Sequence, residues 1–174
     1  INQSLLTINH SPSLPMSRKT YLILFLIALT VQVIVSRFQT IPGYLDANYY
    51  FSGGVQLAQG NGFTEPYIWN YLDDPQGIPH PSHGYWLPLA SIVAALGMWL
   101  TGQQTYEAGR IFFILIAALV PPLTAALSFR FFKNTAFAWT SAFLAIFSVF
   151  HLPFLPVPDN YGIFMIAGGL LFLL

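Results

Sequence analysis

The chain has 174 residues, of which 55% are hydrophobic and only 7% are charged. A soluble domain usually carries about 25% charged residues, and a disordered chain is far less apolar, so the composition excludes both classes and leaves a polytopic membrane protein. Six basic and six acidic side chains cancel, which leaves no electrostatic attraction for nucleic acid, and the absence of cysteine excludes disulfides and thiolate chemistry.

The residues at both ends of the sequence indicate that the chain is a fragment of a longer protein. The first residue is Ile1, whereas Met16 is followed by Ser-Arg-Lys and an apolar run, as at a true N-terminus. Residues 1–15 therefore lie upstream of the native start or form a poorly ordered tail, within an N-terminal tail of residues 1–19. The other end stops inside an apolar run. We expect residues 20–174 to be the N-terminal part of a larger transmembrane domain.

Four apolar stretches approach the roughly 20 residues with which a helix crosses a bilayer. The first follows a basic pair but lacks the small residues of a signal-peptide cleavage site, so we expect a retained anchor. A fifth stretch, residues 85–101, is shorter and contains Pro88 and Gly97. The four expected spans cover about residues 20–37, 109–131, 135–151 and 160–174.

The basic residues indicate that stretch 85–101 lies at the membrane surface rather than crossing. On that interpretation four basic residues share the cytoplasmic side that Lys and Arg favour, and all six acids lie outside. We therefore expect an all-α polytopic membrane protein with outer loops at 38–108 and 152–160, the long first loop containing interfacial helices. The four inner basic residues are Arg18, Lys19, Arg130 and Lys133.

The first outer loop carries clear helix and turn signals. Asp46 can cap a helix that continues from Ala47 to Gln59 and ends at Gly60-Asn61-Gly62. The segment 64–84 is rich in proline and aromatic residues and predicts an ordered irregular loop. Asp73-Asp74 before Pro75 predicts a turn, although adjacent acids can also bind a divalent cation.

Acidic side chains at a membrane surface are costly unless they are used or paired. Asp46 follows the first span and can act either as a general base on a hydroxyl or as a plain helix cap. Asp159 opens the fourth span and has the same two interpretations, functional or capping. Glu65 can pair with Arg37 or Arg110.

His80 and His83 flank Pro81 in a His-Pro-Ser-His sequence. Two histidines at this spacing can share a metal with a carboxylate, but the proline disfavours the helix that would bring them together, so aromatic packing or hydrogen bonding to a substrate is favoured. Arg110 opens the second span, where its side chain can snorkel to the surface or bind a lipid phosphate.

The order of these features resembles the N-terminal part of GT-C fold glycosyltransferases. A basic start and one anchor lead to Asp46, to Tyr49-Tyr50 and to a helix that ends at glycine. The outer loop then ends in Gly84-Tyr85-Trp86-Leu87-Pro88-Leu89, and Arg110 opens the next span. Over residues 20–174 the chain is most similar to family 39, with its protein O-mannosyltransferase-like and aminoarabinose-transferase-like enzymes.

The resemblance implies an integral enzyme of the plasma (inner) membrane, with its active site on the extracytoplasmic face. Such an enzyme moves a sugar, with inversion, from a polyprenyl-phosphate-sugar donor to a hydroxyl of an acceptor protein, lipid or glycan, and Asp46 matches the general base. We expect the fragment to be inactive alone, because the remaining spans should close the site. The implied substrate-binding residues are Asp159, His80, His83, Tyr49, Glu65, Trp86 and Arg110.

The sequence leaves alternatives for the cofactor and for the class of membrane protein. A monophosphate carrier requires no metal, whereas a diphosphate carrier favours a divalent cation, for which Asp46, Asp159 and His83 are candidate ligands. The alternatives are a polytopic transporter or flippase and a non-enzymatic membrane assembly protein. The absence of charge in the middle of the four spans counts against transport, while nothing in the sequence excludes an assembly role.

Overall fold

The structure is a computed structural model that describes residues 16–69 and 75–174. The expectations for residues 1–15 and for the Asp73-Asp74 turn lie outside these described residues. The described part is helical apart from one antiparallel two-stranded ribbon. Its elements are α1 (Arg18–Ser36), α2 (Leu45–Ala58), β1 (Thr64–Glu65), β2 (His80–Pro81), α3 (Leu89–Thr101), α4 (Tyr106–Gly109), α5 (Ile111–Phe132), α6 (Thr135–Ile146) and α7 (Tyr161–Leu173).

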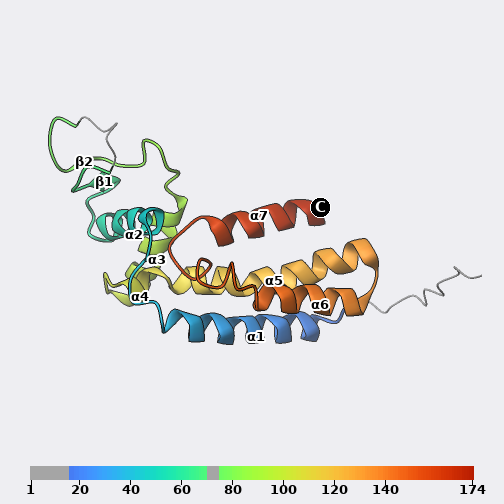
Figure 1. The fold of residues 1–174 in the computed structure, drawn as a ribbon. Coiled ribbons are helices and arrows are strands. Elements are labelled where there is room, and N and C mark those ends of the chain that lie inside the picture. Colours follow the sequence, from blue (N-terminus) through green and yellow to red (C-terminus); the bar gives the residue numbers. More distant parts are fainter. Residues whose placement is uncertain (1–15, 70–74) are drawn as a thin grey trace, which may run out of the picture.

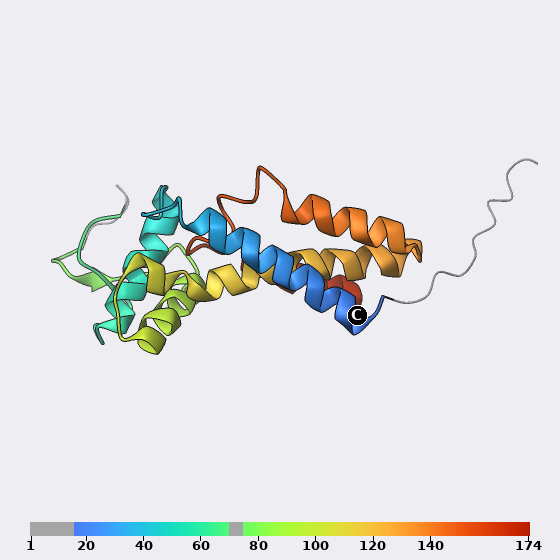
Figure 2. The same cartoon turned by 90° about the horizontal axis from the view of Figure 1, so that it is seen from below.

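Four helices form an elongated bundle, with α5 packed against α1, α6 and α7 (Figures 1 and 2). The shorter helices α2, α3 and α4 and the β ribbon gather at one end of the bundle, where α1 ends and α5 begins (Figure 1). We call this the α2–α4 end. Helix α3 packs against α2, α4 and the start of α5 instead of running through the bundle. That α3 lies at a membrane surface stays a prediction, which the labelling experiment below tests.

Small side chains allow the bundle helices to approach closely. Ala28 of α1, Ala118 and Ala125 of α5, and Ala138 and Ala142 of α6 are all buried in one cluster. Without a large hydrophobic driving force between helices in lipid, such small residues are what lets helix backbones pack by van der Waals contact. Their presence along α5 explains why this helix lies in the middle of the bundle.

Two helical segments of the described chain are long and apolar enough to cross a membrane, judged by length and composition: Arg18–Ser36 and Tyr106–Phe132. They correspond to the expected spans at 20–37 and 109–131 and support membrane association. The remaining apolar helices, α3, α6 and α7, are shorter.

The expected span at 135–151 is longer than the helix that the structure shows there, α6. Helix α6 ends at Ile146 rather than near residue 151. The Ser148 hydroxyl and the His151 ring lie 3.0 Å apart, and the backbone N–H groups of His151 and Leu152 both donate to the Ser148 carbonyl. These local bonds, followed by three prolines, replace the helical ladder with turns. Residues 147–160 then continue toward the α2–α4 end, where α7 begins (Figure 1).

The start of α2 also differs from the prediction. Tyr44 occupies the N-cap position without a side-chain capping bond, and Asp46 lies in the first helical turn. The prediction that Asp46 caps this helix is therefore wrong, and its negative charge faces the positive end of the helix dipole instead. The predicted end is confirmed: α2 stops at Ala58, and Gly60 takes a left-handed conformation with φ 82°.

Cysteine labelling tests the position of α3 relative to the membrane, and the chain has no native cysteine to interfere. Gln76 precedes α3, Gln103 follows it, and both side chains are exposed at the α2–α4 end. We expect Gln76→Cys and Gln103→Cys to react with an impermeant maleimide from the same side of intact vesicles, and Lys19→Cys to react only from the other side. Labelling of the Gln76 and Gln103 variants from opposite sides would mean that α3 crosses the membrane.

Candidate functional site

Two acidic residues far apart in the sequence interact electrostatically at the α2–α4 end. The Tyr44 hydroxyl donates to Oδ2 of Asp159 at 2.6 Å, and the backbone N–H of Asn160 donates to Oδ1 of the same carboxylate. The Asn160 side-chain amide donates to the Tyr50 hydroxyl at 2.7 Å. This network joins the first turns of α2 to the residues just before α7, and it brings Asp46 into the neighbourhood of Asp159.

The network rests on a small packed core. Ala47 of α2, Tyr106 of α4 and Val157 are buried together, and the Tyr44 ring packs edge-on against Phe154 with 5.5 Å between ring centroids. Prolines 156 and 158 are fully buried. Because proline fixes its own φ, the segment before α7 is rigid and holds Asp159 in place.

Electrostatics link the two acids. Asp159 is only 6% exposed, and burial raises its pKa, with the nearby charge of Asp46 acting in the same direction while the bonds from Tyr44 and Asn160 oppose the rise. Burial, followed by the charges of Asp159 and Asp46, raises the pKa of Tyr50 to about 12. The pKa of Tyr44 is raised by burial and by its bond to Asp159. The same pair of carboxylates therefore acts on both tyrosines.

The two acids differ in their hydrogen bonding. Asp159 is buried and accepts bonds on both oxygens, whereas Asp46 is half-buried and accepts no hydrogen bond from any residue that the structure describes. Asp159 is thus held in place by the fold, whereas no described residue donates a hydrogen bond to Asp46. Asp159 precedes the N-cap position of α7, which Asn160 occupies, so the simple capping interpretation of Asp159 does not hold.

The raised pKa of Asp159 predicts a pH-dependent stability. The folded protein binds a proton at Asp159 more tightly than the unfolded chain, so the free energy of unfolding falls as pH rises from the ordinary value of 3.8 through the raised value. We expect the thermal midpoint in detergent to fall in the wild type as the pH rises above about 4, and to fall less in Asp159→Asn, which carries no charge and keeps one acceptor oxygen. Equal slopes in the two proteins would contradict this assignment.

A second polar group forms between α2, α3 and the β ribbon. Tyr49 is buried, and its hydroxyl accepts the backbone N–H of His83 at 2.6 Å and lies beside Glu65. The His83 ring contacts the Ser91 hydroxyl through Nε2 at 3.0 Å, and burial lowers its pKa. Trp86 is half-buried with its ring 6.2 Å from that of Tyr49. Four of the predicted substrate-binding residues, Tyr49, Glu65, His83 and Trp86, therefore lie together.

Glu65 and His80 face each other across the β ribbon, where they are register partners. Glu65 is 4% exposed, and one of its carboxylate oxygens has no hydrogen-bond partner. The His80 ring contacts the Tyr67 carbonyl through Nε2 at 2.9 Å, while the His83 ring contacts Ser91. The two histidine rings thus have different neighbours, as the intervening proline predicts. Within the described residues, no three acidic or histidine side chains gather in a group that could hold a metal ion.

Arg110 belongs to a third location. It is 5% exposed, its guanidinium donates from Nη1 to the Gln39 carbonyl at 2.6 Å, and it stacks 4.6 Å above the Tyr106 ring. The predicted pairing of Glu65 with an arginine is not what the structure shows, because Glu65 lies in β1 beside Tyr49 instead. Arg110 is not among the charges that shift the pKa of Asp159, Tyr44 or Tyr50. The predicted site residues therefore divide into three groups.

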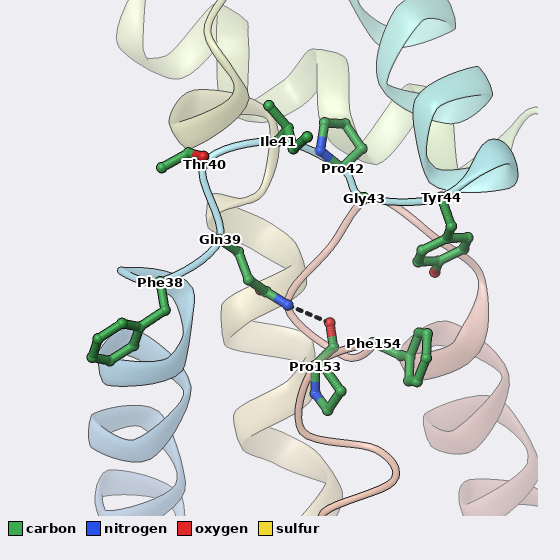
Figure 3. Close-up of a pocket in the computed structure, with 9 residues that line it drawn as sticks. All are labelled: Phe38, Gln39, Thr40, Ile41, Pro42, Gly43, Tyr44, Pro153 and Phe154. Atoms are coloured by element: carbon green, nitrogen blue, oxygen red, sulfur yellow. Dashed lines mark hydrogen bonds between the residues drawn. The ribbon is translucent and has the colours of Figure 1, made fainter.

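A groove of about 340 Å³ opens beside Tyr44 (Figure 3). One wall is the loop of residues 38–44, and the other is Pro153 with Phe154. Gln39 spans the two walls, donating from its side-chain amide to the Pro153 carbonyl at 2.6 Å. The side-chain oxygen of Gln39 is buried without a partner. The groove thus adjoins the Tyr44 ring, whose hydroxyl holds Asp159.

Sequence reasoning missed Tyr44, Tyr50, Asn160 and Gln39. Their neighbours in sequence, Asp46 and Asp159, were recognised, but a hydrogen bond across 115 residues leaves no local pattern. The only available signal was the clustering of hydroxyl and amide side chains directly beside each acid.

Comparisons with known proteins give no family assignment: no protein-family model, curated protein or solved structure matches the chain. The fold itself defines a mostly helical protein with two candidate membrane-spanning helices among the described residues.

Proposed function

We propose that this chain is the N-terminal part of a polytopic GT-C-type membrane glycosyltransferase, with Asp46 as its general base on the extracytoplasmic side. The observation that carries the proposal is the carboxylate pair at the α2–α4 end. Asp159 is buried and accepts one hydrogen bond on each oxygen, whereas Asp46 is half-buried and accepts none from the described residues. A general base must keep an oxygen available for the proton it takes, and Asp46 meets that requirement.

The proposed reaction uses a sugar linked to a polyprenyl phosphate. The acceptor hydroxyl attacks carbon 1 of the sugar from the face opposite the phosphate, the bond from carbon 1 to the phosphate oxygen breaks, and its electron pair leaves with the polyprenyl phosphate. The acceptor proton passes to Asp46. Asp159 acts as a positioning residue, because it holds Tyr44 at the start of α2, two residues before Asp46. The products are the glycosylated acceptor, with inverted configuration, and the free carrier.

The groove beside Tyr44 supports the same assignment. Its volume of about 340 Å³ lies at the low end of the ~300–1,000 Å³ typical of small-ligand pockets. It lies at the end of the bundle where a carrier embedded in the bilayer would present its phosphate. A monophosphate carrier requires no metal in this scheme. With a diphosphate carrier, Asp46 and Asp159 are the neighbouring carboxylates, whereas His83 lies in the separate Tyr49 group.

The test is a transfer assay on the full-length protein in membrane vesicles. A panel of polyprenyl-phosphate sugars, each radiolabelled in the sugar, is supplied, and the label that leaves the lipid fraction is measured. We expect one donor to lose its label faster than in vesicles without the protein, with free polyprenyl phosphate released in equal amount. If no donor of the panel loses label above that background, the transferase proposal fails.

The same vesicles distinguish the alternatives. Movement of the intact labelled lipid to the opposite leaflet, without loss of the sugar, would favour a flippase. The charged side chains of α1 and α5 lie near their ends, at Arg18, Lys19 and Arg130, which provides no charged path through the bundle and favours transfer over transport.

A further inference from the structure

A second groove, of about 320 Å³, lies where α1 ends and α5 begins. Its lining also includes the C-terminal end of α3 and part of α4, so four helices contribute to it. All four meet at the α2–α4 end of the bundle (Figure 1). Because α1 and the α4–α5 segment are the two candidate membrane spans, this groove lies at the level where a spanning helix meets the membrane surface.

The polar half of the groove carries two arginines. Arg110 is almost fully buried, and a guanidinium has five N–H donors, of which the Gln39 carbonyl takes one through Nη1. Arg37 is exposed, and its side chain donates to no residue of the described chain. Glu107 is the one acid among the lining residues, so the lining keeps a net positive charge. A buried guanidinium without a hydrogen-bonded carboxylate is costly, and an anion in the groove would offset that cost.

The other half of the groove is apolar. Val33 comes from α1, and Ile111 and Ile114 come from the first turns of α5, all on the two candidate spans. A free phosphate ion would use only the arginines and leave this apolar surface uncovered. A ligand with a phosphate next to a hydrocarbon chain would cover both halves, and such a ligand is a lipid.

We propose that this groove binds an anionic bilayer phospholipid, with its phosphate on Arg37 and Arg110 and an acyl chain along Val33, Ile111 and Ile114. Guanidinium groups bind phosphate through paired, charge-assisted hydrogen bonds, which suits them to this role. Neither Asp46 nor Asp159 lines this groove, and it shares no lining residue with the groove beside Tyr44, so the ligand is a lipid of the surrounding bilayer and not the sugar carrier. The inference does not depend on the proposed transferase activity.

Lipid binding at this groove would also stabilise the site next to it. Gln39 accepts from Arg110 through its backbone carbonyl and donates to Pro153 through its side chain. The phosphate would hold Arg110, Arg110 holds Gln39, and Gln39 closes the groove beside Tyr44 that Figure 3 shows. Occupancy by a phospholipid should therefore raise the thermal stability of the whole α2–α4 end.

The experiment measures phospholipid retention by the full-length protein, purified in detergent, with native mass spectrometry and a thermal-shift assay. The probes are phosphatidylglycerol, phosphatidylcholine, inorganic phosphate and polyprenyl phosphate. We expect phosphatidylglycerol to bind most tightly and to raise the thermal midpoint, and Arg37→Gln to weaken its binding about tenfold, the loss of roughly one hydrogen bond to a charged group. Arg37→Lys, which keeps the charge, should lose less. Arg130→Gln, at the far end of α5, should bind like the wild type.

A second variant tests the apolar half without changing charge. Val33 is partly exposed on α1, and Val33→Trp should fill that half and lower phosphatidylglycerol binding while the protein remains monodisperse. Unchanged binding in both Arg37→Gln and Val33→Trp would overturn the proposal. Inorganic phosphate that competes equally well would show a simple anion site, and preferential binding of polyprenyl phosphate would show a carrier site; either result would also overturn it.

Discussion

Replacing Asp46 by asparagine is expected to lower sugar transfer by about two to four orders of magnitude, the contribution usual for a general base. Asparagine has nearly the same shape and keeps the acceptor oxygen in the first turn of α2, but it cannot take up a proton. Asp46 accepts no hydrogen bond within the described residues, so the substitution breaks no hydrogen bond of the fold. The measurement is the initial rate at which label leaves the lipid-linked donor in vesicles, normalised to the amount of folded protein.

The matched control is Gln76→Glu, an equally small change on an exposed side chain outside the carboxylate pair. It should transfer sugar at the wild-type rate. Asp159→Asn should also be compared, because it removes the charge that acts on Tyr44 and Tyr50 while its amide keeps one acceptor oxygen. A transfer rate for Asp46→Asn within about threefold of the wild type, well short of the 10²–10⁴ of a general base, would remove Asp46 from the mechanism.

Replacing Gly97 by alanine should produce the largest loss of stability among single-methyl changes in α3. A Cβ atom at this position would lie 2.1 Å from the Ala108 carbonyl oxygen and 3.2 Å from its carbonyl carbon. Both are backbone atoms of α4, which cannot rotate away as a side chain would, so α3 and α4 must separate. Overpacking of this kind costs about 1–3 kcal/mol or more, which lowers a thermal midpoint by several degrees in a protein of this size.

The measurement is the thermal midpoint in detergent, followed by the loss of the monodisperse peak in size-exclusion chromatography. Gly168→Ala in α7 is the control, because no atom outside its own helix lies within 4 Å of the added Cβ. Alanine is a better helix former than glycine, so this variant should be as stable as the wild type or more stable. If Gly97→Ala has the midpoint of the wild type, then α3 and α4 do not pack as closely as described.

The contact at Gly97 also explains why α3 matters to the candidate site. Through it α3 holds α4 in place, and α4 supplies Tyr106, which packs against Ala47 and Val157 beneath the carboxylate pair. Helix α3, although it is short for a membrane span, therefore supports the groove and the two acids at the α2–α4 end. Its role is structural, which the sequence pattern alone did not indicate.

The sequence by itself determined the features that depend on local physics. The apolar lengths of residues 20–37 and 109–131 correspond to α1 and α5, because a long apolar helix satisfies its own backbone and needs no distant partner. The end of α2 at Gly60 was predictable for a similar reason, since glycine adopts the left-handed conformation without strain.

Only the tertiary structure decided how the functional side chains are grouped. Tyr44 donates to Asp159 across 115 residues, and Asp46 lies in the first turn of α2 instead of at its cap. Glu65 is the neighbour of Tyr49 rather than of an arginine. Arg110, three residues from Glu107 in α4, turned toward Gln39 and a separate groove. These pairings depend on how α2, α4 and the buried segment 156–158 before α7 pack together. Such long-range contacts leave no periodic or spacing signal along the chain.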